Sequence, residues 1–303
     1  MSSPVEAPSP PRLSIVVAAW TGGEALQRCV RSLQDQLRPG DDIIVASNFA
    51  WSHSNAPYSA GARIIDLPLD PGTTVPELRA AGLAAASGSI VAFTEDHCVV
   101  TPGWREALLR GYETGAEGVG GPVGLAPGGR PLDWAVYFYD YARFAPPMRS
   151  GLVRSLSGAN MSFARSFLET SRELLRHEVL ESILEREFLR RGRSMYLEAE
   201  AIVVHGARQA VARSVVLAFA LARGYAAGRV ENAPRMRRLG FASATPLLPL
   251  VLAARILAAM APRGKLGRLA LATPWLALLL GSWSAGECAG YLAGAGNSRR
   301  LWR

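Results

Sequence analysis

Short apolar runs alternate with segments of helical periodicity through the first 125 residues, and this alternation constrains the fold more than any other feature. Four of the runs have the length and composition of buried strands, at 13–18, 42–46, 62–67 and 89–94. Between the first two, Leu26, Val30, Leu33 and Leu37 recur at helical spacing. Strands separated by helices of this length are typical of an α/β fold with a mainly parallel sheet.

Two capping boxes predict where two of the helices begin. Thr21 is followed three residues later by Glu24, and Thr74 by Glu77. Further strands are expected at 118–125, 158–164 and 200–205, with a helix over 179–191. The segment 133–144 is rich in aromatic residues, among them Trp134, Tyr137, Tyr139 and Tyr141. Their side chains could pack in the core, stack on acceptor sugars or contact the membrane.

The charge of the chain is divided unevenly at about residue 208. Residues 1–208 carry 20 basic and 23 acidic residues, whereas residues 209–303 carry 13 basic and two acidic residues. The basic residues of the second part lie beside long apolar runs and do not form a basic stripe with interleaved aromatic residues. This pattern favours an anionic membrane surface over nucleic acid as the partner.

The apolar runs of the last 95 residues predict membrane association. Residues 239–254 and 269–286 are uncharged, and about 20 apolar residues span a bilayer. Both a spanning hairpin and a shallow hairpin remain open. Arg255 and Glu287 interrupt the runs, and either the two residues pair with each other or Arg255 reaches toward the 263–268 loop. Three widely spaced cysteines exclude a disulfide framework and favour a reducing compartment.

These observations divide the chain into five parts. We expect a disordered leader at 1–11, an α/β domain at 12–208 and an amphipathic interfacial helix with its linker at 209–240. A membrane-associated helical hairpin follows at 241–298, and a basic tail at 299–303.

Ligands of open parallel sheets bind at the carboxyl ends of the strands. The fourth strand ends at Glu95, Asp96 and His97, and carboxylate and imidazole donors of this kind suit Mg²⁺ or Mn²⁺. A solvated strand-end turn is the alternative. The chain lacks a G-x-G-x-x-G after the first strand and a P-loop, which disfavours a dinucleotide dehydrogenase and a P-loop nucleotidase.

The order of the segments resembles the family-2 glycosyltransferases, which have the GT-A fold. The resemblance covers about residues 12–208 and lies in LSIVVAAWTGGEALQRCVRSLQDQ, DDIIVASN, ELRAAGLAAASGSIVAFTEDHC, PGW, GGPVG, SGANMSFAR, LESILEREFLRRG and AEAIVVHGA. It implies a GT-A, Rossmann-like and mainly parallel sheet flanked by helices, followed here by apolar C-terminal helices.

The resemblance also implies roles for single residues in the donor site. Glu95, Asp96 and His97 stand where the family has its Asp-x-Asp motif, so we expect the acids to contact the donor and Asp96 and His97 to ligate a divalent metal, Mg²⁺ or Mn²⁺. His205 matches a family histidine near the metal or the phosphates, and we expect it to ligate the metal as well. The other expected donor contacts flank the nucleobase or the diphosphate: Ala19, Trp20, Asn48 and Arg79.

The family places its catalytic base on a helix that ends in a Leu-Arg-Arg-x-Gly-like sequence. Counting back from Gly192 gives Glu181 as the base, with Glu178 as the alternative. The alternative is that these acidic residues form a solvated face of the helix without a catalytic role.

The resemblance therefore implies a membrane-associated, inverting glycosyltransferase of glycan biosynthesis. Its expected donor is a nucleotide-sugar, a UDP-sugar first, and its acceptor a hydroxyl of a lipid-linked or envelope glycan. Transfer to a polyprenyl phosphate, in which Arg223 and Arg229 matter more than Glu181, is one alternative. A degenerate nucleotide-sugar-binding membrane module is the other. Membrane lipids are expected partners, nucleic acid is not, and the expected location is the inner membrane with the catalytic domain facing the cytoplasm.

Overall fold

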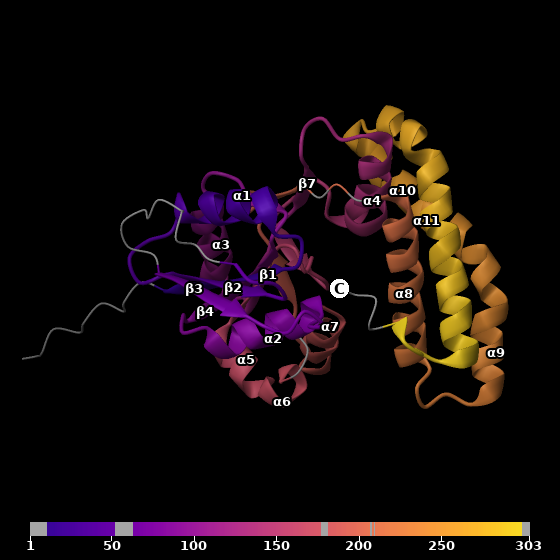
Figure 1. Cartoon of the computed structure of the whole chain (residues 1–303), viewed down its shortest axis with the longest axis horizontal. Helices are drawn as coiled ribbons and strands as arrows, with labels where there is room; N and C mark the ends of the chain where they lie inside the picture. The colour runs from indigo at the N-terminus through magenta and orange to yellow at the C-terminus, as the bar shows by residue number, and fades with distance from the viewer. Residues whose placement is uncertain (1–10, 52–62, 177–180, 207, 209, 299–303) are drawn as a thin grey trace, which may run out of the picture.

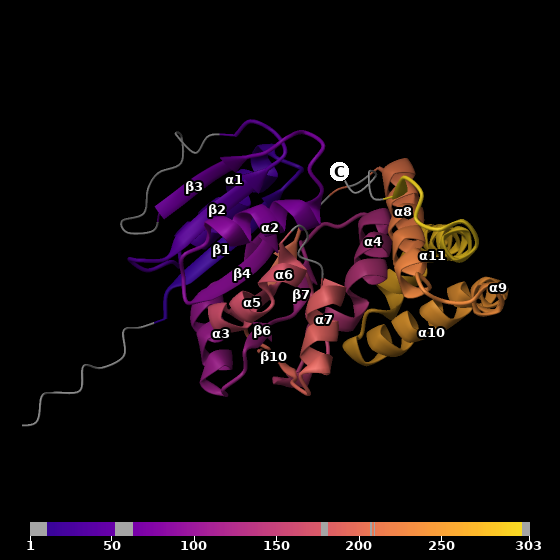
Figure 2. The same ribbon diagram turned by 90° about the horizontal axis from the view of Figure 1, so that it is seen from below.

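The computed structural model describes residues 11–51, 63–176, 181–206, 208 and 210–298. An α/β domain lies beside a layer of long C-terminal helices, and helix α4 lies between the two (Figures 1 and 2). The leader, apart from residue 11, and the basic tail fall outside the described residues, as does Glu178.

The large sheet has eight strands and is mixed, with a parallel half. Strands β1 to β4 are all parallel, β9 runs antiparallel to β4 and β6, and β8 runs antiparallel to β10. From one edge to the other the order is β3 (Arg63–Pro68), β2 (Asp42–Ser47), β1 (Leu13–Ala19), β4 (Ile90–Glu95), β9 (Met161–Ala164), β6 (Gly118–Gly120), β10 (Met195–Leu197) and β8 (Gly151–Val153). The four strands predicted for the first 95 residues are confirmed to within one residue at each end.

A second, three-stranded sheet stands beyond the carboxyl ends of the first. Its strands are β5 (Cys98–Val100), β11 (Val203–His205) and β7 (Val123–Leu125). A single strand over 118–125 was expected, and this prediction is wrong. The chain changes sheet at Gly121, whose α-carbon packs against the Ala201 carbonyl without room for a side chain, and Pro122 has no N–H to donate.

Helices cover both faces of the large sheet. The side chains of β1 alternate between two apolar cores, one shared with α1 and α3 and the other with α2, α5 and α7. Figure 1 shows α1 above the sheet and α2 with α5 below it. The bounds are α1 (Gly23–Gln34), α2 (Val75–Ala85), α3 (Trp104–Glu113), α4 (Pro131–Tyr141), α5 (Arg165–Thr170), α6 (Arg172–Leu175) and α7 (Glu181–Arg190), with a 3₁₀ turn at Ala142–Phe144.

The two predicted capping boxes have different outcomes. Glu77 Oε2 accepts the Thr74 N–H at 2.7 Å, so the box that opens α2 is confirmed. The box of Thr21 and Glu24 is wrong, because α1 begins at Gly23 with Gly22 as its N-cap residue at a φ of 69°. The N–H groups that precede this helix are bound by a side chain from elsewhere in the chain, described below.

The C-terminal layer consists of long, closely packed helices. Helix α11 packs along α8 and also contacts α4, α9 and α10. Three helical segments are long and apolar enough to cross a membrane by length and composition: Val211–Arg229, Arg235–Arg263 and Leu266–Ala293. They comprise α8 (Val211–Arg229), α9 (Arg235–Ala244), α10 (Leu248–Met260) and α11 (Leu266–Ala293), with 3₁₀ turns at Thr245–Leu247 and Ala261–Arg263.

Charged residues in this layer are paired in a way that the sequence did not indicate. The buried carboxylate of Glu287 accepts hydrogen bonds from Trp283 Nε1 at 2.8 Å and from the Tyr291 hydroxyl at 2.7 Å. Its ion pair is with Arg229 of α8, at 3.4 Å. Arg255 is exposed on α10 and is not the partner of Glu287.

Small residues allow α8 and α11 to approach closely. A Cβ on Gly286 would overlap the Phe219 carbonyl oxygen, and a Cβ on Gly290 would overlap the Arg223 carbonyl oxygen. Glycines four residues apart on one face are typical of close packing between apolar helices. Because the obstacle is backbone, it cannot rotate away.

We therefore predict that Gly286→Ala separates α8 from α11 and destabilises the protein by roughly 1–3 kcal/mol, the usual range for overpacking. Gly281→Ala is the matched control, because a Cβ at Gly281 on the same helix meets no atom within 4 Å. Unfolding of the detergent-solubilised full chain, followed by circular dichroism, measures both. Equal stability of the two variants would contradict the close packing at Gly286.

Candidate active site

The site lies where the order of the parallel strands reverses. Strand β1 connects through α1 to β2 on one side, while β4 pairs with the other side of β1. A crevice forms outside the carboxyl ends of strands at such a reversal. Trp20 follows the end of β1, and Glu95 ends β4, so the predicted donor and metal residues meet there.

A cluster of carboxylate and imidazole groups fills this point. Glu95 Oε2 lies 3.1 Å from His97 Nε2, and the His97 and His205 ring centroids are 4.7 Å apart. The ligand atoms of Glu95, His97 and Cys98 all lie within 4.8 Å of one another. Cys98 was not among the predicted site residues, although it directly follows His97 in the sequence.

Charge interactions set the protonation of the cluster. Burial alone would raise the pKa of Glu95, but the hydrogen bond and charge of His97, together with Arg79, lower it to about 2. Burial would lower the pKa of His97, but its hydrogen bonds to Asp96 and Glu95 raise it to about 9. Burial, and then the charge of His97, lower the pKa of His205 to about 3, so His205 is neutral near pH 7.

These residues fit a divalent metal. His205 is neutral, which is the form that ligates, and its buried Nδ1 has no hydrogen-bond partner among the described residues. Glu95 and His97 bring a carboxylate and an imidazole together, and the His205 ring lies beside His97. Donors of this kind suit Mn²⁺ better than Mg²⁺, which prefers oxygen donors. Burial, and then the Glu95 carboxylate, raise the pKa of the Cys98 thiol well above its usual value, so Cys98 is a neutral thiol here.

Asp96 is fully buried, and protein donors already contact both of its carboxylate oxygens. Oδ2 accepts the backbone N–H groups of Trp20 at 3.0 Å, Thr21 at 2.6 Å and Gly22 at 2.7 Å. Oδ1 lies 3.2 Å from His97 Nδ1. The prediction that Asp96 itself ligates the metal stays a prediction, and these contacts point to a different role.

Arg79 connects the metal cluster to the predicted base. Its buried guanidinium donates Nη2 to Glu95 Oε1 at 2.9 Å and Nη1 to Glu181 Oε1 at 3.0 Å. Helix α2 can hold Arg79 this close to the sheet because the residue one turn on is Gly82. A side chain at that position would overlap Val16 of β1. Glu181, at the start of α7, keeps a third of its side-chain surface exposed.

Gly158 explains why the SGAN segment belongs to the site. A Cβ at this position would overlap Glu181 Oε1 and press on Arg79 Nη2. Instead of a strand from 158, as expected, residues 157–160 form a turn in which the Asn160 N–H donates to the Ser157 carbonyl at 2.9 Å. The turn brings Gly158 against the ion pair of Arg79 and Glu181.

The remaining predicted donor residues lie around the same edge of the sheet. The Trp20 ring meets His97 edge-on at 5.6 Å, and Arg213 of α8 lies 5.1 Å over the Trp20 ring. Asn48 is half-buried, and its amide nitrogen donates to the Thr73 carbonyl at 3.2 Å. Ala19 is fully buried at the end of β1, so only its backbone can reach a ligand.

The aromatic residues of α4 pack against other parts of the protein. The Tyr137 hydroxyl donates to the Val123 carbonyl at 2.8 Å, and Tyr139 meets Trp283 of α11 at 5.7 Å. Tyr141 approaches His205 at 5.0 Å and thus closes one side of the cluster. Asp140, which sequence analysis missed, is solvent-exposed near the site, and desolvation by the neighbouring protein, and then the Glu95 charge, raise its pKa.

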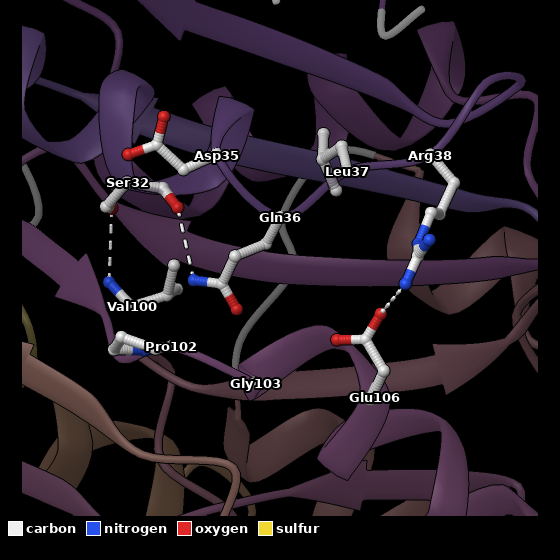
Figure 3. Close-up of a pocket in the computed structure, with 9 residues that line it drawn as sticks. All are labelled: Ser32, Asp35, Gln36, Leu37, Arg38, Val100, Pro102, Gly103 and Glu106. Atoms are coloured by element: carbon white, nitrogen blue, oxygen red, sulfur yellow. Dashed lines mark hydrogen bonds and ion pairs between the residues drawn. The ribbon is translucent and has the colours of Figure 1, made fainter.

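A cavity of about 530 Å³ lies away from this cluster. Figure 3 shows it between the carboxyl end of α1 and the start of α3, lined by residues that include Asp35, Arg38 and Glu106. Arg38 and Glu106 pair with each other across it at 3.0 Å. The amino end of α1 touches Asp96, and a 12-residue helix is about 18 Å long, so the cavity and the cluster are separate.

Comparison with known proteins identifies the family. The model of glycosyl transferase family 2 matches residues 14–172, more than half of the chain, and the chain therefore belongs to this family. The predicted fold class, an α/β sheet of GT-A type with apolar helices after it, is confirmed.

No curated protein matches the chain at a significant level. A solved structure that is similar to it is GalNAc-T7 with UDP, GalNAc and Mn²⁺, at 14% identity and a TM-score of 0.47. The alignment covers 67% of this chain and 45% of that one, so the chain spans less than half the length of GalNAc-T7.

Proposed function

We propose that the protein is a metal-assisted, inverting glycosyltransferase that works at a membrane surface. It transfers a sugar from a nucleotide-sugar, with a UDP-sugar as the expected donor, to an acceptor hydroxyl. The observation that carries the proposal is the bridge of Arg79 between Glu95 and Glu181. This bridge supports the proposal, because the groups that we propose to bind phosphate, hold the metal and accept the proton lie side by side at the switch point.

The donor diphosphate would lie between the cluster and Arg79. Glu95, His97 and His205 would hold Mn²⁺, which when bound would neutralise charge on the leaving diphosphate. A guanidinium matches phosphate oxygens in a bidentate manner, and Arg79 has two of its nitrogens at this place. The Trp20 ring and the Asn48 amide are the proposed contacts for the nucleobase.

Glu181 is the proposed general base. It would accept the proton of the acceptor hydroxyl while this oxygen attacks the sugar from the face opposite the diphosphate, so a single displacement inverts the anomeric carbon. Diphosphate oxygens that bind Arg79 compete with the carboxylates for the same nitrogens. Donor binding would therefore release Glu181 to the acceptor.

The outer face of the C-terminal layer supports membrane attachment. Large apolar side chains stand exposed along α9, α10 and α11, where a soluble protein would carry polar ones: Met236, Leu239, Leu247, Leu250, Val251, Leu257, Leu266, Leu271, Trp275, Leu278 and Leu292. An acceptor that is itself embedded in or delivered by the membrane fits this placement. We propose a lipid-linked or envelope glycan on the cytoplasmic face of the inner membrane.

The loop between α10 and α11 bears on how the layer meets the bilayer. Arg263 Nε donates to the Ala145 carbonyl at 2.8 Å, and Lys265 and Arg268 lie over Trp134 of α4. These contacts keep the basic loop on the same side as the catalytic domain. They favour a layer that lies in the membrane interface over a two-helix hairpin whose tip emerges on the opposite side.

The contacts of two arginines weigh against a polyprenyl phosphate acceptor. Arg229 is paired with Glu287 and the Tyr291 hydroxyl, and Arg223 Nε donates to the Gly294 carbonyl at 2.9 Å. Both side chains thus have structural partners. The convergence of Glu95, His97, Arg79 and Glu181 likewise favours an enzyme over a degenerate binding module.

Substitution of the base tests the reaction type. Glu181→Gln keeps the size and one hydrogen-bond acceptor but cannot take a proton, so we expect kcat to fall by about 10²-fold or more with donor binding retained. Glu185→Gln on the same helix is the matched control, because Glu185 faces Arg143 at 3.8 Å and not Arg79. A fall of less than about threefold in Glu181→Gln would contradict its role as base.

Membrane attachment predicts a difference between two sets of surface substitutions. Leu250→Glu, Leu257→Glu and Leu271→Glu together place three charges on the apolar face and should release the full chain from membranes in a carbonate wash. Leu152→Glu, Leu174→Glu and Leu189→Glu, at comparably exposed positions of the catalytic domain, should leave it bound. Wild-type protein in the soluble fraction after the wash would refute the attachment.

A further inference from the structure

Asp96 carries a buried negative charge that no lysine or arginine neutralises among the described residues. Its side chain is completely buried, and the one ion pair that the described part of the chain gives it is with His97. A buried carboxylate with so few cationic partners is expensive unless hydrogen bonds to the charged form are numerous. Its four hydrogen-bond partners show what those bonds hold in place.

One oxygen of this carboxylate fixes the turn between β1 and α1. Three successive N–H groups, from Trp20 to Gly22, converge on Oδ2. These groups precede α1, whose N-cap residue is Gly22 and which has no side-chain cap of its own. Asp96, at the end of β4, thus binds the N–H of the N-cap residue and the two N–H groups before it, where the positive end of the helix also favours a negative charge. The Trp20 backbone is thereby tied to the metal cluster.

The other oxygen orients His97. Oδ1 lies 3.2 Å from Nδ1, and on the opposite side of the ring Nε2 faces Glu95 Oε2 at 3.1 Å. When a metal takes the place of the Nε2 proton, a carboxylate that holds the Nδ1 proton keeps the Nε2 lone pair directed at the metal. Partners of this kind behind a ligating histidine set its tautomer and orientation.

We propose that Asp96 is a positioning residue and not a metal ligand. One carboxylate fixes the imidazole of His97 through Oδ1 and the nucleobase-flanking turn through Oδ2, so that the metal site and the nucleobase site are built as one unit. The inference rests on the proposed function, since it assigns His97 to a metal, but the hydrogen bonds on which it stands are properties of the protein alone.

Replacement of Asp96 by asparagine separates the contact with His97 from the contacts with the turn. Three N–H donors meet at Oδ2, so an asparagine must turn its carbonyl oxygen toward them and its NH₂ group toward His97. Nδ1 then has to accept a hydrogen bond, and the ring proton moves to Nε2, which faces Glu95. The turn keeps its hydrogen bonds, whereas Nε2 of His97 holds its proton and is not available to a metal.

The first experiment is a double-mutant cycle on Mn²⁺ affinity, measured by electron paramagnetic resonance on the detergent-solubilised full chain with UDP present. Asp96→Asn and His97→Ala should each weaken Mn²⁺ binding about 10- to 100-fold, the usual effect of losing such a partner. The double variant should bind Mn²⁺ no more weakly than His97→Ala. Two independent ligands would give losses of Mn²⁺ affinity that multiply in the double variant, and this result would overturn the proposal. Wild-type Mn²⁺ affinity in Asp96→Asn would overturn it too.

Asp41→Asn is the matched control. Asp41 is also a buried carboxylate that binds backbone N–H groups, those of Leu13 and Arg38, but it lies at the amino end of β1, away from the cluster. Its amide should reduce stability and leave Mn²⁺ affinity unchanged. Weaker Mn²⁺ binding in Asp41→Asn would mean that loss of any such carboxylate has this effect, against a specific role for Asp96.

Two further measurements keep the proposal separate from the proposed function and from folding defects. The ¹⁵N shifts of the His97 ring in Asp96→Asn should place the proton on Nε2 even if the wild type binds no Mn²⁺, and a proton on Nδ1 overturns the proposal. Failure of the wild type to bind Mn²⁺ with UDP would instead refute the metal site. In wild-type protein labelled with ¹³C-aspartate, Mn²⁺ should show no strong carboxylate coupling, and a strong coupling would make an aspartate a ligand.

Discussion

The ion pairs of Arg79 are the interaction on which the catalytic arrangement depends. The guanidinium is buried between two carboxylates, one from the end of β4 and one from the start of α7, which are remote from each other in sequence. Removing a partner from such a buried group leaves an uncompensated charge, which is strongly destabilising. Two glycines allow this contact. Gly82 lets α2 lie close to β1, and Gly158 has no side chain that would overlap the Glu181 carboxylate.

The catalytic domain and the C-terminal layer share an apolar core, and this links chemistry to the membrane. Buried residues of α4, including Leu132 and Phe138, form one cluster with Ile256 of α10 and Leu276 of α11. The carboxyl end of α4 in turn brings Tyr141 against His205. Helix α8 adds Arg213 over the Trp20 ring. The helices that we propose to meet the lipid thus pack against α4 and α8, whose residues contact His205 and the Trp20 ring.

The sequence was sufficient wherever a feature depends on local pattern. Strands β1, β2 and β4 are fully buried apolar runs, so their positions were predictable, and so was the cluster of acids and histidine at the end of β4. The capping of α1 was not, because the carboxylate comes from Asp96, 74 residues beyond Gly22. The break between β6 and β7 depends on the contact of Gly121 with Ala201, and the partner of Glu287 on how α8 packs against α11. Such pairings follow from tertiary contacts that no periodicity encodes.

We propose that the cluster at the switch point takes part in sugar transfer with the help of a metal. The most direct test is nucleotide release by the full chain from a panel of nucleotide-sugars, with a membrane lipid extract as the source of acceptor, with and without Mn²⁺. We expect one donor, a UDP-sugar first, to release its nucleotide only when both Mn²⁺ and the extract are present, and the product to have the inverted anomeric configuration. Metal-dependent binding of a nucleotide-sugar without release from any donor, or release that a chelator leaves unchanged, would contradict it.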